Sequence, residues 1–243
     1  MTANVPRLRI FAGPNGSGKS TIKSVLSEEL LGIYINPDEI EKEISRKKLL
    51  PLDRFHVAFN PNDLLTFFQE SELLKNKGLL GNIKDLNFDN KNFNFQNVKM
   101  NAYFASVIAD FIRKKLMECR RSFTFETVLS SQDKITLLEK AQKLGYRTYL
   151  YYVATEDPEI NISRVSHRVN MGGHFVPEDK IVSRYHRSLA LLWDAIHHTN
   201  RAYIFDNSGS EKVWLAKITN RSEIEIKSEL IPAWFENAVL KKV

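Results

Sequence analysis

The segment from Gly13 to Thr21 constrains this chain more than any other feature. It fits the pattern G-x-x-x-x-G-K-[ST] of a loop that binds phosphate groups. Glycines at this spacing let the backbone turn tightly, so that successive N–H groups point into one concavity. The lysine of the pattern can reach the β- and γ-phosphates of a nucleotide, and the next hydroxyl can bind Mg²⁺. The expected nucleotide-binding residues are Gly13, Pro14, Asn15, Gly16, Ser17, Gly18, Lys19, Ser20 and Thr21, with Ser20 as the metal ligand.

The residues on either side of this loop fit the same interpretation. Leu8 to Ala12 form an apolar run with the length of a buried strand. After the loop, apolar residues recur at helical spacing up to a helix stop at Gly32, namely Ile22, Val25, Leu26 and Leu30. Strand, loop and helix in this order place phosphates at a helix N-terminus, which favours anions. An ordinary glycine-rich turn is the alternative, and the agreement of motif and context argues against it.

Length and composition indicate a globular protein with one large domain. The chain has 243 residues, of which 43% are hydrophobic and 26% charged. We expect a single domain over 1–243, with a variable insertion at about 51–99 and a C-terminal hairpin plus helix at about 211–243. The net charge of +6 suits a phosphorylated substrate, an acidic partner or nucleic acid about equally.

Targeting signals and cysteine usage point to the cytoplasm. The first residues, Met1 to Pro6, lack the apolar region of a signal peptide. No apolar run is long enough to span a bilayer. Cys119 is the single cysteine, which excludes an internal disulfide, and we expect it to be a small buried residue on a helix.

The alternation of strands and helices predicts an α/β fold with a mostly parallel central sheet and helices on both faces. The run Tyr149 to Val153 is strongly apolar and aromatic, as expected of a central strand. Ala202 to Phe205 forms a further short strand, and a terminal hairpin is expected across 219–222. Between Pro51 and Lys99 the pattern weakens. Asn62 could cap a helix reaching Leu74, and the Asn-rich and Phe-rich residues 81–99 have no sustained period, so we expect a long loop there.

Acidic and hydroxyl side chains follow two of the predicted strands. Asn36 and Pro37 form a helix cap and first turn after the strand over 32–35, and Asp38 comes next. Ligands bind at the carboxyl edge of open α/β sheets, which makes Asp38 a candidate general base, although the helix dipole alone would also favour an acid there. Glu126 and Thr127 end the predicted strand from Phe123 to Val128 and are candidate substrate-binding residues.

A pair of basic helices around a glycine-rich tip predicts a lid over phosphates. The first helix begins at Asp157-Pro158 and carries Arg164, His167, Arg168 and Met171 on one face. The tip is Gly172-Gly173-His174, and the second helix begins at Pro177 and carries Lys180, Arg184 and Arg187. A solvated basic face is the more ordinary explanation, but arginines on both arms of a flexible tip suit phosphate binding.

Taken together, these motifs resemble the zeta toxin family. The matching segments are A-G-P-N-G-S-G-K-S-T, I-N-P-D-E-I, F-T-F-E-T-V-L-S-S, R-V-x-x-R-V-x-x-G-G-H-x-V-P and Y-I-F-D-N-S. The resemblance implies a P-loop kinase fold and phosphorylation of UDP-N-acetylglucosamine at its 3′-hydroxyl, with ATP and Mg²⁺. It also implies a toxin that starves cell-wall synthesis and a partner antitoxin that blocks the nucleotide site.

Carried over by motif, the resemblance assigns roles to particular residues. Lys19 and Ser20 would hold the triphosphate and the metal, and Asp38 would be the general base. Glu126 and Thr127 match the substrate-contacting segment, to which Asn36 adds a further candidate contact. Arg164 and Arg168 match the transition-state arginines. The second of these departs from the pattern, because the family places it near the lid tip, so that Arg184 or Arg187 could serve instead.

Two other functions remain compatible with the sequence. One is a kinase of another nucleotide or nucleoside, which has the same phosphate site but a different acceptor pocket. The other is an ATP-driven switch or binding module. Asp38 separates these classes, because a kinase needs a base for the acceptor hydroxyl and a switch does not.

Overall fold

The computed structural model describes residues 5–89 and 91–243, which fall into two compact units. The first unit comprises the described residues up to Gly32 together with Thr124–Val243, and the second is Ile33–Phe123. Residues Met1 to Asn4, on which the expectation of no signal peptide rests in part, lie outside the described residues. The expectation of one domain with an insertion stays a prediction.

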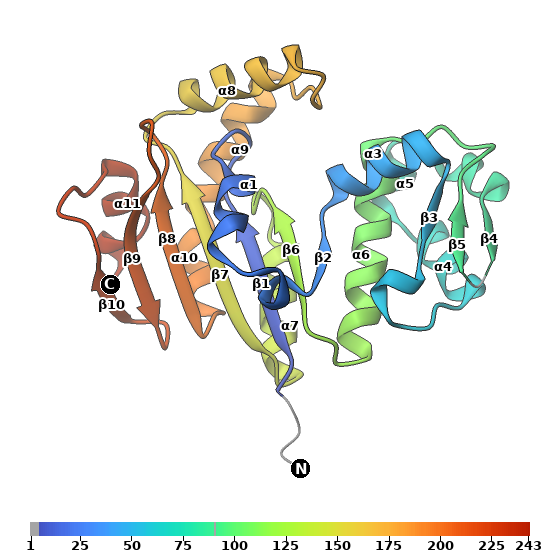
Figure 1. The fold of residues 1–243 in the computed structure, drawn as a ribbon, viewed down its shortest axis with the longest axis horizontal. Helices are drawn as coiled ribbons and strands as arrows, with labels where there is room; N and C mark the ends of the chain where they lie inside the picture. Colours follow the sequence, from blue (N-terminus) through green and yellow to red (C-terminus); the bar gives the residue numbers. More distant parts are fainter. Residues whose placement is uncertain (1–4, 90) are drawn as a thin grey trace. The chain divides into compact units, whose positions relative to one another are not determined.

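The first unit is built on strands of a mostly parallel sheet (Figure 1). Its strands lie in the order β10-β9-β8-β7-β1-β6. β1 pairs in parallel with β7, and β7 with β8, whereas β9 is antiparallel to both β8 and β10. The strands are β1 (Arg7–Ala12), β6 (Phe123–Thr127), β7 (Arg147–Ala154), β8 (Arg201–Asp206), β9 (Val213–Thr219) and β10 (Glu223–Ile226).

The central position of β7 follows from its composition. Leu150, Tyr152 and Ala154 are fully buried on one face, and Tyr151 is nearly so on the other. A strand covered on both sides needs this continuous apolar character. The predicted central strand is therefore confirmed. The α/β class is confirmed by the sheet and its helices, and the terminal hairpin by the antiparallel pairing of β9 with β10.

Helices of the first unit pack on the sheet and continue beyond its edge. They are α7 (Asp133–Lys143), α8 (Pro158–Asn170), α9 (Glu178–Ala190), α10 (Leu192–His197) and α11 (Ala233–Ala238), followed by the short η4 (Leu240–Lys242). Figure 1 shows α9 and α10 behind β7 and β8, and α8 above the ends of the strands. The Asp157 side chain accepts a hydrogen bond from Glu159 N and caps α8, as the Asp-Pro pair predicts.

The helix after the phosphate loop differs from the prediction. In place of one helix up to Gly32, the chain forms α1 (Lys19–Ile22), η1 (Lys23–Val25) and α2 (Glu28–Leu31). Thr21 Oγ1 donates to Gly18 O at 2.6 Å and Ser24 Oγ to Thr21 O at 2.7 Å. Such side-chain bonds to nearby carbonyls compete with helix continuation. Leu26 is then extended, and Leu30 is exposed instead of facing the core.

The second unit begins with the short strand β2 (Ile33–Ile35). It combines α3 (Pro37–Lys47) and the long α6 (Ala102–Glu118) with a small antiparallel sheet in the order β3-β5-β4. Asn36 caps α3 as predicted, accepting a hydrogen bond from Asp38 N at 2.9 Å. The remaining elements are β3 (Leu49–Pro51), η2 (Asp53–Phe55), α4 (Pro61–Gln69), α5 (Glu72–Asn76), η3 (Leu80–Asp85), β4 (Asn87–Asp89) and β5 (Asn92–Asn94).

Three expectations for this unit were wrong. Residues 81–99 are not one long loop, because they contain β4, β5 and most of η3. Asn62 does not cap a helix reaching Leu74. Asn60 caps α4, since Pro61 occupies the first helical position, and a separate helix α5 follows. Cys119 is exposed, because α6 ends just before it. Among the described residues, none of the helices combines the length and apolar character that crossing a bilayer requires.

Candidate functional site

The phosphate loop follows β1 and contains glycines in conformations that other residues adopt rarely. Gly13 has φ 142° and Gly18, which caps α1, has φ 95°. A Cβ atom at Gly13 would lie 2.0 Å from Val153 O, and one at Gly18 would lie 2.2 Å from Asn207 Nδ2. The loop therefore needs glycine at both positions, for backbone conformation and for close packing against β7 and the segment after β8.

Two asparagine side chains brace the carbonyl groups of this loop. Asn161 Nδ2 on α8 donates to Asn15 O at 2.6 Å, and Asn207 Nδ2 after β8 donates to Ser17 O at 2.9 Å. Asn161 is fully buried, and its Oδ1 accepts a hydrogen bond from Thr155. These bonds fix the loop at two points with groups from outside it, which preorganises it for an anion.

Removing one brace should weaken nucleotide binding. In Asn207→Ala, Ser17 O loses its partner, and a lost buried hydrogen bond costs about 1–3 kcal/mol. We expect ATP affinity to fall by about tenfold and the melting temperature to drop by a few degrees, measured by calorimetric titration and thermal unfolding. Asn237→Ala, which removes an exposed amide from α11, is the matched control and should change neither. Unchanged ATP affinity in Asn207→Ala would contradict the bracing role.

The polar groups of the loop fit a triphosphate with Mg²⁺. Ser17 Oγ is buried and has no hydrogen-bond partner in the part of the chain that is described, so a phosphate oxygen would satisfy it. Lys19 Nζ donates to Gly13 O at 3.0 Å and to Pro14 O at 2.9 Å, which holds the ammonium group against the loop. The Ser20 hydroxyl group belongs to an exposed residue at the start of α1, where a metal ion can reach it.

The basic helix pair forms as expected. α8 and α9 pack through a small apolar cluster of Val165, Val176 and Ile181, with Ile162 and Val169 against it. This packing holds the arginines of both helices on defined faces.

The arginines of this pair have different surroundings. Arg164 donates to Asn207 O at 2.6 Å and to Gly209 O at 3.1 Å. Arg168 donates to His174 O at 3.1 Å, which ties it to the tip between the helices. Arg184 NH1 lies 3.5 Å from Asn15 Oδ1, a direct link from α9 to the phosphate loop. The structure thus brings Arg164 and Arg184 to the loop and its braces, and Arg168 to the tip.

A buried carboxylate organises the segment after β8. Asp206 accepts hydrogen bonds from Ser208 N at 2.9 Å, Ser208 Oγ at 2.8 Å and Trp234 Nε1 at 2.8 Å. Three donors satisfy the buried charge, and the contacts with Ser208 form a turn of the kind that aspartate favours. Asp206 thereby holds the segment that carries Asn207.

A tyrosine links α9 to the same region. Tyr185 OH donates to Thr155 O at 2.7 Å and also contacts Glu156 O. Burial raises the pKa of the Tyr185 phenol, and the nearby charges of Glu156, Asp157 and Asp206 raise it further. Tyr185 therefore remains a hydrogen-bond donor that anchors α9 to the end of β7.

The candidate acceptor-binding residues divide between the two units. Glu126 and Thr127 end β6 and are partly buried, and Thr127 Oγ1 accepts a hydrogen bond from Leu129 N at 3.2 Å. In the second unit, Asn36 caps α3 and Asp38 lies in its first turn, where it is exposed. The roles of these residues stay predictions.

The sequence profile described as Zeta toxin matches residues 90–219, more than half of the chain. The chain belongs to the zeta toxin family. The phosphate loop lies outside the matched residues, so the evidence for a nucleotide site there comes from its own pattern and geometry.

Individual relatives of this zeta toxin family member are distant or partial. An uncharacterized protein of Haemophilus influenzae is 36% identical over 63 residues, which cover 26% of this chain and 45% of that protein. The crystal structure of AvrRxo1-ORF1:AvrRxo1-ORF2 with sulphate ions is similar in fold, with a TM-score of 0.60, 15% identity and coverage of 93% of this chain and 62% of that one. The same complex with ATP gives a TM-score of 0.59 at 15% identity, covering 99% and 63%. The chain thus spans less than two thirds of the length of these relatives.

Sequence reasoning missed the residues that brace the loop of this zeta toxin family member. Asn161 and Asn207 lie 146 and 190 positions from the loop residues that they contact. Asn207 stands in the segment Y-I-F-D-N-S that carries the family resemblance, which was the one available signal.

Proposed function

We propose that this protein is a kinase that uses ATP and Mg²⁺ to phosphorylate a hydroxyl group of a nucleotide sugar, with UDP-N-acetylglucosamine as the first candidate. Membership of the zeta toxin family supports this proposal. The observation that carries it is the braced phosphate loop. This loop holds Lys19 and a Ser17 hydroxyl without a hydrogen-bond partner among the described residues, and Arg184 of the basic helix pair contacts it at Asn15. We further propose that it acts in the cytoplasm as the toxin of a toxin–antitoxin pair. The similar fold crystallised as a two-component complex with ATP is compatible with both the donor and a protein partner.

Phosphoryl transfer requires in-line positioning and neutralisation of negative charge more than covalent chemistry by the protein. Lys19 would exchange its carbonyl partners for oxygens of the β- and γ-phosphates, and Ser17 would donate to a further oxygen. Ser20 would hold Mg²⁺, which neutralises charge on the phosphates when bound. Lys19 and Ser20 are the first two residues of the short helix α1.

The lid arginines would neutralise charge on the transferring group, because a guanidinium fork binds phosphate oxygens in pairs. We assign this role to Arg164 and Arg168. Their hydrogen bonds to backbone carbonyls would be exchanged for phosphate as the lid closes. Arg184 is the alternative for the second position, since it already contacts the loop residue Asn15.

Acceptor binding is assigned to Glu126, Thr127 and Asn36, and proton acceptance to Asp38. A carboxylate base orients the acceptor hydroxyl and takes its proton. Its exposed position leaves the Asp38 carboxylate accessible to a substrate.

A direct product assay tests the proposal. The protein is incubated with ATP and Mg²⁺ and a panel of UDP-sugars, nucleotides and nucleosides, and phosphorylated products are sought by mass spectrometry. We expect a phosphorylated UDP-N-acetylglucosamine that is absent with the Lys19→Ala variant. If only another acceptor is phosphorylated, that acceptor replaces the nucleotide sugar as the proposed substrate. Release of inorganic phosphate with no phosphorylated acceptor would favour an ATP-driven switch and contradict the proposed kinase activity.

A further inference from the structure

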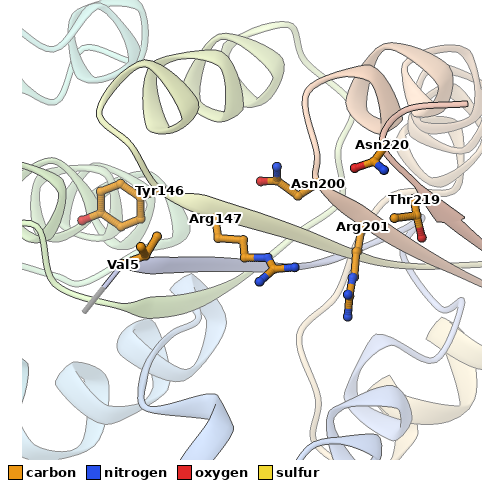
Figure 2. A pocket seen from close by; sticks show the side chains of 7 residues that line it. All are labelled: Val5, Tyr146, Arg147, Asn200, Arg201, Thr219 and Asn220. Carbon is orange, nitrogen blue, oxygen red and sulfur yellow. The ribbon is translucent and has the colours of Figure 1, made fainter. Parts of the chain in front are cut away.

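A second basic site lies at the opposite end of the strands from the phosphate loop. Among the described residues, a cavity of about 330 Å³ opens where β7 and β8 begin, and its lining includes Arg147, Asn200, Arg201 and Thr219. Figure 2 shows the side chains of Arg147 and Arg201 extending to the same side of the strands. Six residues of β1 separate this end from the loop, a length of about 20 Å at ~3.3 Å per residue.

The strand register places three arginines on the face of the sheet that carries Tyr149. Tyr149 is paired with Arg9 on β1 and with Arg201 on β8. Arg147 is two residues before Tyr149 and therefore shares its face of the sheet. Arg9 Cζ lies 5.4 Å and Arg147 Cζ 5.9 Å from the centroid of the Tyr149 ring. We call Arg9, Arg147 and Arg201 the arginine cluster.

The charge of the arginine cluster is not balanced by carboxylates. Within residues 5–89 and 91–243 none of its three guanidinium groups forms an ion pair, and Arg201 Nε is buried without a hydrogen-bond partner. The nearby acids are engaged elsewhere, since Asn220 donates to Glu223 and two lysines pair with Glu225.

Burying a charge of the arginine cluster also lowers the stability of the folded protein. Arg9 is only 7% exposed, and burial lowers the pKa of its guanidinium, to which the charge of Arg7 contributes. Arg7 is paired with Arg147 in the β1–β7 register, so a further positive charge lies beside the cluster. An anion bound among these groups would offset the cost of burying the Arg9 charge.

The neutral groups of the cavity are held in place. Asn200 Oδ1 accepts from Thr148 N at 2.8 Å and from the Thr148 hydroxyl at 3.1 Å, which fixes the segment that leads into Arg201. Thr219 is paired with Arg201 in the β8–β9 register, and both residues line the cavity.

We propose that the arginine cluster is a second anion site, separate from the nucleotide site, that binds a small phosphate ester or inorganic phosphate. Guanidinium groups bind phosphate oxygens in bidentate pairs, and Arg147 and Arg201 provide two such forks on neighbouring strands. The bound phosphate would join the first residues of β1, β7 and β8, and β1 leads directly into the phosphate loop.

Calorimetric titration with inorganic phosphate tests this site while the nucleotide site is saturated with Mg²⁺ and a non-hydrolysable ATP analogue. We expect one further binding event, at least about tenfold weaker in Arg147→Gln and in Arg201→Gln, because each removes a charged donor worth about 1.5 kcal/mol or more. Arg221→Gln is the matched control. It removes the same charge from an exposed residue in the β9–β10 turn and should leave the affinity unchanged.

Two results would overturn the second site: no binding beyond the saturated nucleotide site, or an equal loss of affinity in Arg221→Gln. Thermal unfolding without phosphate checks that the variants are folded, and Arg147, an exposed residue, can be replaced without opening the core. Titration with 5′-AMP under the same conditions distinguishes the sources of the phosphate. Tighter binding than inorganic phosphate identifies a nucleotide, and equal binding identifies the phosphate group alone.

Discussion

Replacing Lys19 with alanine is expected to abolish phosphoryl transfer, lowering the rate by about a thousandfold or more. Removing one preorganised charge-stabilising donor costs about 10²–10³ in rate in enzymes of known mechanism, and a cationic group on a transferring phosphate costs more. Lys19 Nζ now donates to Gly13 O and Pro14 O within the loop itself, so its removal also leaves two loop carbonyls without this partner. ATP affinity should therefore fall together with the transfer rate, as measured by calorimetric titration and by the mass-spectrometric product assay.

A second lysine near the same segment provides the control for Lys19. Lys212 Nζ donates to the backbone oxygen of Thr21, the last residue of the loop, at 3.3 Å, whereas Lys19 donates to Gly13 O and Pro14 O. Lys212→Ala removes an equal charge from a half-buried residue whose ammonium group lies near the Phe205 ring, and it should retain transfer within a factor of about three. Transfer by Lys19→Ala at the rate of the unmodified protein would show that the loop does not act on the phosphates.

Local signals in the sequence predict much of this fold. Asn36-Pro37 and Asp157-Pro158 each place a capping side chain before a proline at the first helical position, and both helices begin there. The apolar run around Leu150 predicts the central strand because burial on both faces requires it. These signals involve neighbouring residues only, and the chemistry of each residue type is sufficient to interpret them.

Very short strands and contacts between residues far apart in the sequence could not be predicted. The strands β3, β4 and β5 have three residues each, too few to establish a period. Asparagine is depleted from strands, so Phe88 and Phe93, which pair across β4 and β5, stand in an unfavourable context. The braces from Asn161 and Asn207 depend on the folded sheet that brings α8 and β8 to the loop. Capping and periodicity carry no information about such contacts.

The site shows the same division between local and long-range information. Lys19 and Ser20 follow from a contiguous pattern. Which lid arginine lies nearest the phosphate loop does not follow from such a pattern, because it depends on the carbonyl or amide group that each guanidinium contacts in the folded protein. Arg184 contacts Asn15, and Arg168 contacts the backbone of His174 six residues away on its own lid. The helical faces on which these arginines lie could be predicted, but their partners could not.

Replacing Asp38 with alanine is expected to abolish transfer while leaving ATP binding intact. A general base contributes about 10²–10⁴ in rate, so product formation should fall by at least a hundredfold. Asp38 lies in the first turn of α3, where its backbone N–H and not its carboxylate makes the capping bond with Asn36. Alanine keeps that bond and is a good helix former, so the cost to stability is limited to the interaction with the helix dipole, about 0.3–1 kcal/mol. ATP affinity is measured by calorimetric titration and transfer by mass spectrometry on the same preparations.

The neighbouring acid separates catalysis from the dipole effect. Glu39 is exposed in the same turn, and Glu39→Ala removes an equal charge from the same helix end. If Asp38 only complements the helix dipole, the two variants should lose equal stability and both keep transfer. If Asp38 takes the acceptor proton, Asp38→Ala alone loses transfer, and its ATP affinity equals that of Glu39→Ala. Full transfer activity in Asp38→Ala would remove the base from the mechanism and, with it, the feature that distinguishes a kinase from an ATP-driven switch.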